Sequence, residues 1–365
     1  MKESIVSKPY TFKRLNIQIQ NRTVLAAMTN KQSHDNGVIS NDEIDWLVER
    51  AKGKFGIITT AATNVSLQGK AWDGEFGVYD DSQLPQLTKL TTNIHQTKSI
   101  IIAQLFHGGI RSPQKITGTI PISCSEIDCN ESETGKSKEA TEKDIKKIIN
   151  DFTCSAIRCC EAGFDGIELH GAHGYLISQF LGKKTNLRKD RWGGNLKNRS
   201  RLLNEIISSI KNNVPESFII GIRISPEIES MGIELNDSIN LIGQLKNLSI
   251  DFIRLSCWDV FAKSISLIDD DRTITQIITQ SYSKLPTIIS TGNVWSSIDA
   301  ENLLNQGSDL VGVGRVAIAH PNWPKNILDL KYNPKKPPFT VEELEKAKLN
   351  QTFISYMKNW KNFVK

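Results

Sequence analysis

The feature that most constrains the fold is a series of about eight short apolar runs, each followed by a longer stretch with helical periodicity. These runs end at Ala27, Thr60, Leu105, Leu169, Ile224, Ser256, Ser290 and Val313. Most are continuous and rich in β-branched residues, which is typical of parallel strands covered on both faces. About eight such strands with helices between them predict an α/β fold, a single (β/α)8 TIM barrel.

The main alternative is a doubly wound sheet with a dinucleotide-binding half. No G-x-G-x-x-G motif follows the first run, so this alternative lacks its expected signal. The chain has 365 residues, and a barrel needs about 250, which leaves roughly a hundred for long loops after the third and fourth strands and a C-terminal extension. We therefore expect a barrel over residues 1–330 and a helical extension packed on it over residues 331–365.

Capping boxes support the expected helices. In this pattern a hydroxyl side chain and an acidic side chain three positions later each bond a free backbone amide of the other. The pattern occurs at Ser40 to Glu43 and at Thr141 to Asp144, each before an amphipathic stretch. It also occurs at Thr340 to Glu343, where we expect the helix of the C-terminal extension to begin.

The composition fits a globular protein, since 39% of the residues are hydrophobic and 23% are charged. A net charge of +5 is too small for a dedicated nucleic-acid binder. No run reaches the ~18 apolar residues of a membrane span, and the first residues lack a secretory apolar segment. We expect a cytoplasmic protein that acts on a small-molecule substrate, without nucleic-acid or membrane partners. Formation of a homo-oligomer is left open.

The cysteines do not predict a metal site. There are 6 of them, and none has the C-x-x-C spacing of zinc or iron–sulfur sites. Free thiols fit a reducing compartment. We expect no bound metal.

Polar residues follow the ends of the predicted strands. In a TIM barrel these ends meet at one face, where the active site lies. The residues expected to gather there are Thr29, Ala62, Gln104, His107, His170, His173, Tyr175, Arg223, Ser256, Gly292, Asn293, Gly314 and Arg315.

The densest part of this set is the segment from His170 to Tyr175, which holds two imidazoles and a phenol among glycines. Two imidazoles can donate hydrogen bonds to one oxygen as negative charge builds on it, and a phenol can supply a proton. A metal site would need a further ligand at regular spacing, such as an H-E-x-x-H motif, which is absent. The remaining alternative is a pair of histidines that only stabilise a loop.

A second signal follows the last two strands, at Gly292–Asn293 and Gly314–Arg315. Loops at these positions commonly bind phosphate in TIM barrels, because glycine exposes backbone N–H groups and a helix begins nearby. Thr29, Gln104 and Arg223 would then face the mouth, a layout suited to a flat heterocycle with carbonyl and imide groups. The alternative for Arg223 is a salt bridge with a core carboxylate such as Glu168.

Three motifs carry a resemblance to a known family. They are N-R-T-V at Asn21–Val24, which leads into Met28–Thr29, then Q-L-F-H at Gln104–His107, and the stretch 164–201. The last contains H-G-A-H-G-Y-L, followed by R-x-D-R-W-G-G and N-R. From Asn21 to about Pro324 the chain resembles the old yellow enzyme family of FMN-dependent oxidoreductases. The resemblance implies non-covalent FMN and NAD(P)H as the reductant.

The resemblance also implies how FMN is held. Thr29 would hydrogen-bond the flavin O4, Ala62 would contact the ring through its backbone, and Gln104 would bind the pyrimidine edge. Arg223 would lie near N1 and O2, where a cation stabilises the anionic reduced flavin. The full set implied to bind FMN is Ala27, Met28, Thr29, Ala62, Gln104, Arg223, Gly292, Asn293, Gly314 and Arg315.

For the reaction, the resemblance implies reduction of the C=C bond of α,β-unsaturated carbonyl or nitro compounds by hydride transfer from the flavin N5. His170 and His173 would hold the carbonyl or nitro oxygen, and Tyr175 would protonate the α carbon. NAD(P)H would use the same face first, which gives ping-pong turnover. The alternatives are a flavin reductase acting on nitro compounds, quinones or oxygen, and a non-catalytic flavin-binding barrel. Tyr175 beside paired histidines disfavours the latter.

Some positions depart from the family pattern or vary within it. Ala27 stands where most members have proline, and Ala61 where many have glutamate. The aromatic residues of the substrate pocket differ between branches, so Trp72, Trp258 and Phe261 are candidates only. Relatives with an iron–sulfur cluster and a second flavin domain would need cysteines and length that this chain does not have.

Overall fold

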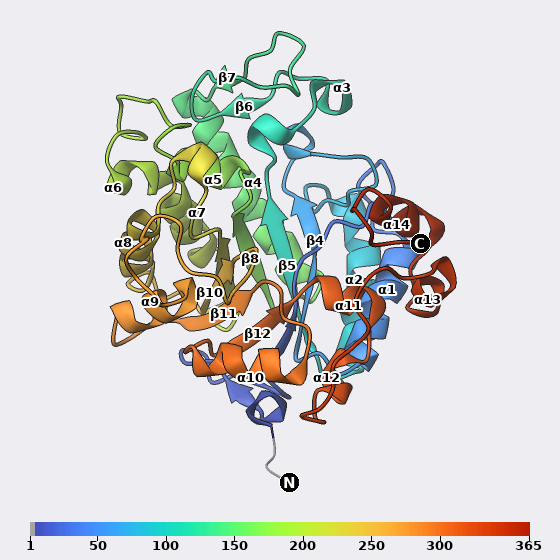
Figure 1. Cartoon of the computed structure of the whole chain (residues 1–365). Helices are drawn as coiled ribbons and strands as arrows, with labels where there is room; N and C mark the ends of the chain where they lie inside the picture. The colour runs from blue at the N-terminus through green and yellow to red at the C-terminus, as the bar shows by residue number, and fades with distance from the viewer. Residues whose placement is uncertain (1–3) are drawn as a thin grey trace.

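The computed structural model describes residues 4–365, and its centre is a closed barrel of eight parallel strands. In barrel order the strands are β3 (Thr23–Leu25), β4 (Ile57–Asn64), β5 (Ile100–Phe106), β8 (Gly166–Gly171), β9 (Ile219–Ile224), β10 (Phe252–Ser256), β11 (Thr287–Thr291) and β12 (Leu310–Val313). The predicted TIM barrel is confirmed, and Figure 1 shows its strands at the centre of the molecule.

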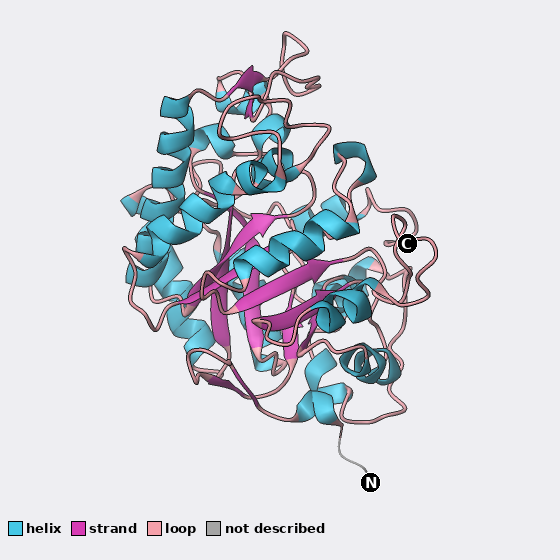
Figure 2. Ribbon diagram, turned by 90° about the vertical axis from the view of Figure 1, so that its left-hand side faces the viewer, coloured by secondary structure: helices cyan, strands magenta, loops and turns pink. Residues whose placement is uncertain are grey.

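Helices surround these strands, as the side view in Figure 2 shows. The α-helices are α1 (Asn41–Lys52), α2 (Leu84–His95), α3 (Gln114–Thr117), α4 (Glu142–Glu161), α5 (Leu176–Leu181), α6 (Leu196–Arg199), α7 (Arg201–Lys211), α8 (Leu235–Leu245), α9 (Ile274–Ser281), α10 (Ser297–Asn305), α11 (Arg315–Ala319), α12 (Trp323–Asn326), α13 (Val341–Lys346) and α14 (Gln351–Met357). Short 3-10 turns are η1 (Ile5–Ser7), η2 (Leu67–Gly69), η3 (Asp81–Gln83), η4 (Gly109–Arg111) and η5 (Glu229–Met231). Within residues 4–365, no helix is both long enough and apolar enough to cross a bilayer.

Five of the eight predicted strand ends were misplaced. β3 ends at Leu25 rather than Ala27, β8 ends two residues later than predicted, at Gly171, and β5 and β11 each end one residue later than predicted. The largest difference is in β4, which continues past Thr60 to Asn64. The register between β4 and β5 shifts between Thr59 and Ala62, and the Thr60 hydroxyl accepts a hydrogen bond from the Gln104 amide at 3.1 Å inside this shift. A side chain therefore replaces the backbone partner there, which lets the strand continue beyond its apolar run.

The amino end of the barrel is filled by apolar side chains and by the hairpin β1 (Tyr10–Thr11) and β2 (Gln18–Ile19). The rings of Phe12 and Phe252 lie 6.5 Å apart there. A Cβ at Gly221 would come within 2.1 Å of the Phe252 ring, so only glycine fits at this position of β9. The polar site residues expected from the sequence therefore belong to the opposite, carboxyl end of the barrel.

The long loops follow β5 and β8 as predicted, and the first carries the small sheet β6 (Ile122–Ser123) and β7 (Lys138–Glu139). Figure 1 shows this sheet and α3 above the barrel. All 6 cysteines are free thiols.

Two of the three capping boxes form as predicted, at Thr141 and at Thr340. At Ser40 the hydroxyl does cap α1 by accepting from the Glu43 amide at 3.1 Å. The second bond of the predicted capping box, from the Ser40 amide to the Glu43 carboxyl, does not form. That carboxyl instead accepts from Asn30 at 2.7 Å and from Ser33 at 2.5 Å. Burial raises the pKa of Glu43 to about 7. Glu43 thus fastens the loop that follows β3.

The C-terminal segment packs α14 against α1. The rings of Phe353 and Trp46 meet edge to face, 5.5 Å apart, and Ile354 and Met357 are also buried. The boundary between residues 330 and 331 stays a prediction. Figure 1 shows the C-terminal helices, in red, on the side of the barrel that carries α1.

Candidate active site

The turn after β8 brings its two histidines and its tyrosine together. His173 and Gly174 adopt left-handed conformations with φ of 59° and 77°, which turns the chain sharply before α5. The ring of His170 then lies 5.0 Å from that of His173 and 4.8 Å from that of Tyr175. The predicted constellation therefore forms at the carboxyl end of the barrel.

Hydrogen bonds hold both imidazoles. His173 Nε2 lies 2.8 Å from the Ser256 hydroxyl, and the His173 amide donates to Ser225 Oγ at 3.2 Å. His170 Nδ1 accepts from the Ala172 amide at 3.3 Å. A neutral His170 therefore carries its proton on Nε2, the atom then left to donate.

Burial decides the protonation states. It lowers the pKa of His170 well below the usual value, helped by the charges of His173, Arg223, Arg111 and Arg254. It also lowers the pKa of His173, with help from Arg223 and Arg111. Burial raises the pKa of Tyr175. At neutral pH the site thus holds two neutral imidazoles and a protonated phenol.

Aromatic side chains enclose Tyr175. Its ring meets Phe106 edge to face at 5.0 Å, and Trp72 stacks on Phe106 at 5.3 Å. Trp72 is therefore in the position predicted for a pocket residue. Trp258 lies instead under the Arg315 guanidinium, 5.3 Å away, and Phe261 packs against the hydrophobic core.

Arg223 lies beside this group with its side chain buried. Its Nη2 donates to Ser256 Oγ at 2.9 Å and its Nη1 to the Ala27 carbonyl at 3.2 Å. Burial lowers the pKa of Arg223 to about 10. Its Nε has no hydrogen-bond partner among the described residues, so a donor remains for a ligand.

The suggested salt bridge between Arg223 and Glu168 does not form. Glu168 pairs instead with Arg254, whose Nε lies 2.7 Å from Glu168 Oε2, and both side chains are fully buried. Gln104 Nε2 donates to the other oxygen of Glu168 at 2.6 Å. The amide oxygen of Gln104 is thus the end left for a cofactor.

The predicted phosphate loops also meet. Arg315 Nη2 lies 3.4 Å from Asn293 Oδ1, and Asn293 donates to Asp259 at 3.0 Å. Gly314 is the N-cap of α11. A Cβ at Gly292 would lie 2.3 Å from the Cys257 carbonyl oxygen, so the loop requires glycine there. Arg315 is exposed and makes none of the ion pairs found within residues 4–365.

The other predicted cofactor residues line the same mouth. Ala62 belongs to the apolar cluster around Tyr175, and Met28 Sδ lies 3.3 Å from a Cβ built on Gly314. Thr29 is close to Tyr356, because its hydroxyl acts to lower the pKa of the Tyr356 phenol, against the effect of burial. His107 differs from these residues, since it is buried and its Nδ1 accepts from the Gly109 amide at 3.1 Å. It stabilises the turn after β5.

Two residues at the mouth, Arg111 and Tyr356, and one buried residue, Arg254, were missed in the sequence. Arg111 lies over the Tyr175 ring, with its guanidinium carbon 4.7 Å from the ring centroid. Tyr356 arrives on α14, far along the chain from the other site residues, so no local motif marks it. Arg254 lies inside a predicted strand. A buried arginine there implies an acidic partner, but the sequence does not show which carboxylate it is.

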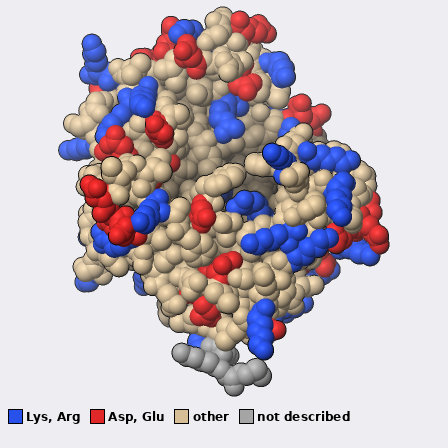
Figure 3. Space-filling view, in the orientation of Figure 1, with Lys and Arg blue, Asp and Glu red and all other residues tan. Residues whose placement is uncertain are grey.

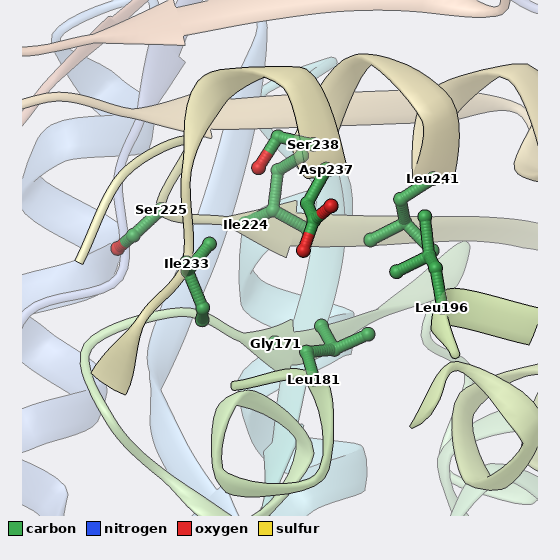
Figure 4. A pocket seen from close by; sticks show the side chains of 9 residues that line it. All are labelled: Gly171, Leu181, Leu196, Ile224, Ser225, Ile233, Asp237, Ser238 and Leu241. Atoms are coloured by element: carbon green, nitrogen blue, oxygen red, sulfur yellow. The ribbon is translucent and has the colours of Figure 1, made fainter. Parts of the chain in front are cut away.

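The small cavity behind β8 and β9 in Figure 4 is not the substrate site. Its volume is about 10 Å³, and it is lined by Gly171, Leu181, Leu196, Ile224, Ser225, Ile233, Asp237, Ser238 and Leu241. Such a volume admits about one water. Within the described chain, no group of three or more His, Cys, Asp or Glu side chains is placed to bind a metal.

Comparison with known proteins decides the family. The profile of the NADH:flavin oxidoreductase / NADH oxidase family matches residues 6–332. The chain belongs to this family. It is thus a member of the old yellow enzyme group that the sequence motifs resemble, and an oxidoreductase that uses FMN and NADH or NADPH.

Individual members of this flavin oxidoreductase family align over most of the chain. A probable NADH-dependent flavin oxidoreductase of Bacillus subtilis is 34% identical over 87% of this chain and 86% of its own length. An NADPH dehydrogenase of Bacillus licheniformis is 31% identical over 85% of this chain and 90% of its own length. The solved old yellow enzyme homologue from Zymomonas mobilis shares the fold, with a TM-score of 0.81 over 94% of this chain and 98% of that chain at 24% identity.

The hydrogen-bond donors at the mouth of the barrel fit the polar groups of FMN. Arg223 has a buried, unpartnered Nε at one end, and Arg315 has an unpaired charge in the described structure at the other. A cation at each end matches a ligand that carries a polar ring system and a phosphate.

Proposed function

We propose that the protein reduces the C=C bond of α,β-unsaturated carbonyl or nitro compounds at the expense of NADH or NADPH. The observation that carries the proposal is the contact of one phenol, Tyr175, with paired imidazoles whose protonation states are fixed by burial. Such a pair suits an oxygen that gains negative charge, and the phenol suits a carbon that needs a proton. Family membership adds the reductant.

In this proposal the histidines bind and orient the substrate. His170 and His173 donate from neutral rings to the carbonyl or nitro oxygen, which polarises the conjugated C=C bond. Ser256 and Ser225 hold His173 by the bonds described above. The positions of both donors are therefore set before the substrate arrives.

Tyr175 holds the proton that the α carbon receives. Burial keeps this phenol protonated, and Phe106 and Trp72 exclude water from its faces. Arg111 lies over the same ring, and a cation there stabilises the phenolate left after proton transfer. Solvent then restores the proton.

The residues proposed to hold FMN are Ala27, Met28, Thr29, Ala62, Gln104, Arg223, Gly292, Asn293, Gly314 and Arg315. FMN bound there would supply the redox chemistry, which is the transfer of a hydride from NADH or NADPH to the substrate. Arg223 would stabilise negative charge on the ring system, and Arg315 with Asn293 would bind the phosphate.

The test is turnover of purified holoenzyme with cyclohexenone, with NADH and NADPH supplied separately. Oxidation of either coenzyme coupled to formation of cyclohexanone supports the proposal. If the coenzyme reduces the enzyme but the enone stays intact, while quinones or nitro groups are consumed, the second candidate function holds. The observation that favours this second candidate is the same pair of imidazoles, because they can also donate to the oxygens of a quinone or a nitro group.

A first prediction concerns the phosphate loops. Arg315→Ala is expected to weaken FMN binding by roughly 10- to 100-fold, because a charge-assisted hydrogen bond contributes about 1.5–3 kcal/mol. The dissociation constant can be measured by quenching of FMN fluorescence. Arg158→Ala is the matched control, since it removes the same charge from α4, where Arg158 pairs with Asp81. Unchanged FMN binding in Arg315→Ala would place the phosphate elsewhere.

A second prediction concerns pH. A free imidazole gains a proton as pH falls through about 6.5, but burial holds the pKa values of His170 and His173 well below this range and raises the pKa of Tyr175 above its ordinary value. The donors and the acid therefore keep one state, and kcat/KM for cyclohexenone is expected to stay level from about pH 6 to pH 9. A tenfold fall between pH 7 and pH 6 would show that an imidazole titrates in the site.

A further inference from the structure

The mouth of the active site carries two cations beyond those proposed to bind FMN. Arg111 ends η4, and its Nη1 donates to the His173 carbonyl oxygen at 2.8 Å. Lys31 lies in the loop after β3, with its Nζ 5.6 Å from the ring centroid of Tyr356. Neither takes part in an ion pair with any acidic side chain of residues 4–365.

Figure 3 shows a hollow on this face of the molecule, with Lys and Arg side chains at its rim. Arg111 is exposed, and Nη1 is its one nitrogen that bonds another described residue. The rest of its planar fork is free to bind a carboxylate through two parallel N–H groups.

One carboxyl group, that of Glu75, acts against these cations. It is the carboxyl that raises the pKa of Tyr175. It is buried, and burial raises its pKa well above the ordinary value. The local field is therefore positive, which favours an anionic ligand.

Arg111 is also close enough to Tyr175 to contact a substrate bound there. It lies 4.7 Å from the Tyr175 ring centroid, and the His170 ring lies 4.8 Å from the same ring. Arg111 and the His170 ring therefore both lie beside Tyr175, so a small molecule whose oxygen is held by the histidines and whose C=C bond lies against Tyr175 is within reach of the guanidinium.

We propose that Arg111, assisted by Lys31, binds a carboxylate on the substrate, so that the preferred substrates are short activated alkenes bearing a carboxylate at the end opposite the carbonyl. The inference rests on the proposed function, because the imidazoles must hold the carbonyl for the carboxylate to reach Arg111. 4-Oxo-2-pentenoate has this form, with the ketone and the carboxylate on either side of one C=C bond. Its methyl ester has the same skeleton without the charge.

The experiment compares these two compounds in the holoenzyme at low ionic strength. In the wild type we expect kcat/KM for the acid to exceed that for the methyl ester by about tenfold or more, as a charge-assisted contact allows. Arg111→Gln is expected to bring the ratio of acid to ester near one, and Arg111→Lys to keep part of it. Lys115→Gln, an equal loss of charge at an exposed site in neighbouring α3, should leave the ratio unchanged. Because the ratio is taken within each variant, general damage to the site cancels.

Two results would overturn the inference. One is a wild-type enzyme that does not favour the acid. The other is a ratio of acid to ester that Arg111→Gln leaves unchanged; if KM for NADH also rises in that variant, the cation belongs to the coenzyme diphosphate.

Binding measurements separate this inference from the proposed function. Titration calorimetry of the oxidised holoenzyme gives the dissociation constants of acid and ester without turnover. If neither compound is reduced but the acid binds about tenfold more tightly in the wild type and equally in Arg111→Gln, the anion site stands and ene-reduction fails. Equal binding of both in the wild type counts against the anion site whatever the turnover.

Discussion

Tyr175→Phe is expected to slow alkene reduction by roughly 10²- to 10⁴-fold, the usual contribution of a positioned general acid. The substitution keeps the ring that packs on Phe106 and His170 and removes only the hydroxyl. Reduction of the enzyme by NADH or NADPH requires no proton at the substrate carbon, so it should keep its wild-type rate. Stopped-flow absorbance of the flavin measures the two half-reactions separately.

The same variant separates the candidate reactions. A quinone accepts its protons on oxygen from solvent, so its reduction is expected to change by no more than a few fold in Tyr175→Phe. Tyr282→Phe serves as the matched control, because its hydroxyl donates to the Ile239 carbonyl at 3.1 Å away from the histidine pair. If Tyr175→Phe reduces cyclohexenone as fast as the wild type, another group supplies the proton and the assignment of Tyr175 is wrong.

The architecture and much of the site could be predicted because both depend on local patterns. Apolar runs identify parallel strands, and the carboxyl ends of such strands meet at one face whatever the loops do. This reasoning brought His170, Tyr175, Arg223 and Arg315 to one mouth, where the structure places them. Their roles stay proposals until tested.

What could not be predicted depends on packing over long distances in the chain. Tyr356 reaches Thr29 because α14 is held against α1 by Phe353 and Trp46, a contact that no motif encodes. The extension of β4 past Thr60 likewise depends on a bond to the Gln104 amide of the next strand.

The partner of Glu168 shows the same limit. Arg223 and Arg254 occupy the same register on neighbouring strands β9 and β10, so the sequence offers two equivalent cations for one carboxylate. The structure distinguishes them, since Arg254 points to Glu168 and Arg223 toward the mouth. This choice leaves Arg223 available to a cofactor.

The second large expected effect is on stability, and it concerns the buried ion pair of Glu168 and Arg254. Arg254→Met is expected to lower the free energy of unfolding by about 3–5 kcal/mol, because removing one partner leaves a buried charge unpaired. The Glu168 carboxylate would keep only the bond from Gln104, and Thr59 Oγ1 would lose its donor at 2.9 Å. Urea denaturation of the FMN-free protein, followed by circular dichroism, measures the change.

Two further variants test the cause. Arg272→Met removes an exposed partner of Asp270 and should cost less than about 1 kcal/mol, as surface ion pairs do. Adding Glu168→Leu to Arg254→Met should recover most of the lost stability, since an apolar pair replaces the unpaired charge. A double variant as unstable as Arg254→Met alone would mean that lost packing, rather than the charge, destabilises the barrel. Because Glu168 also holds Gln104, the double variant should bind FMN more weakly than the wild type even where its stability returns, which separates the pair's effect on the fold from its effect on the mouth.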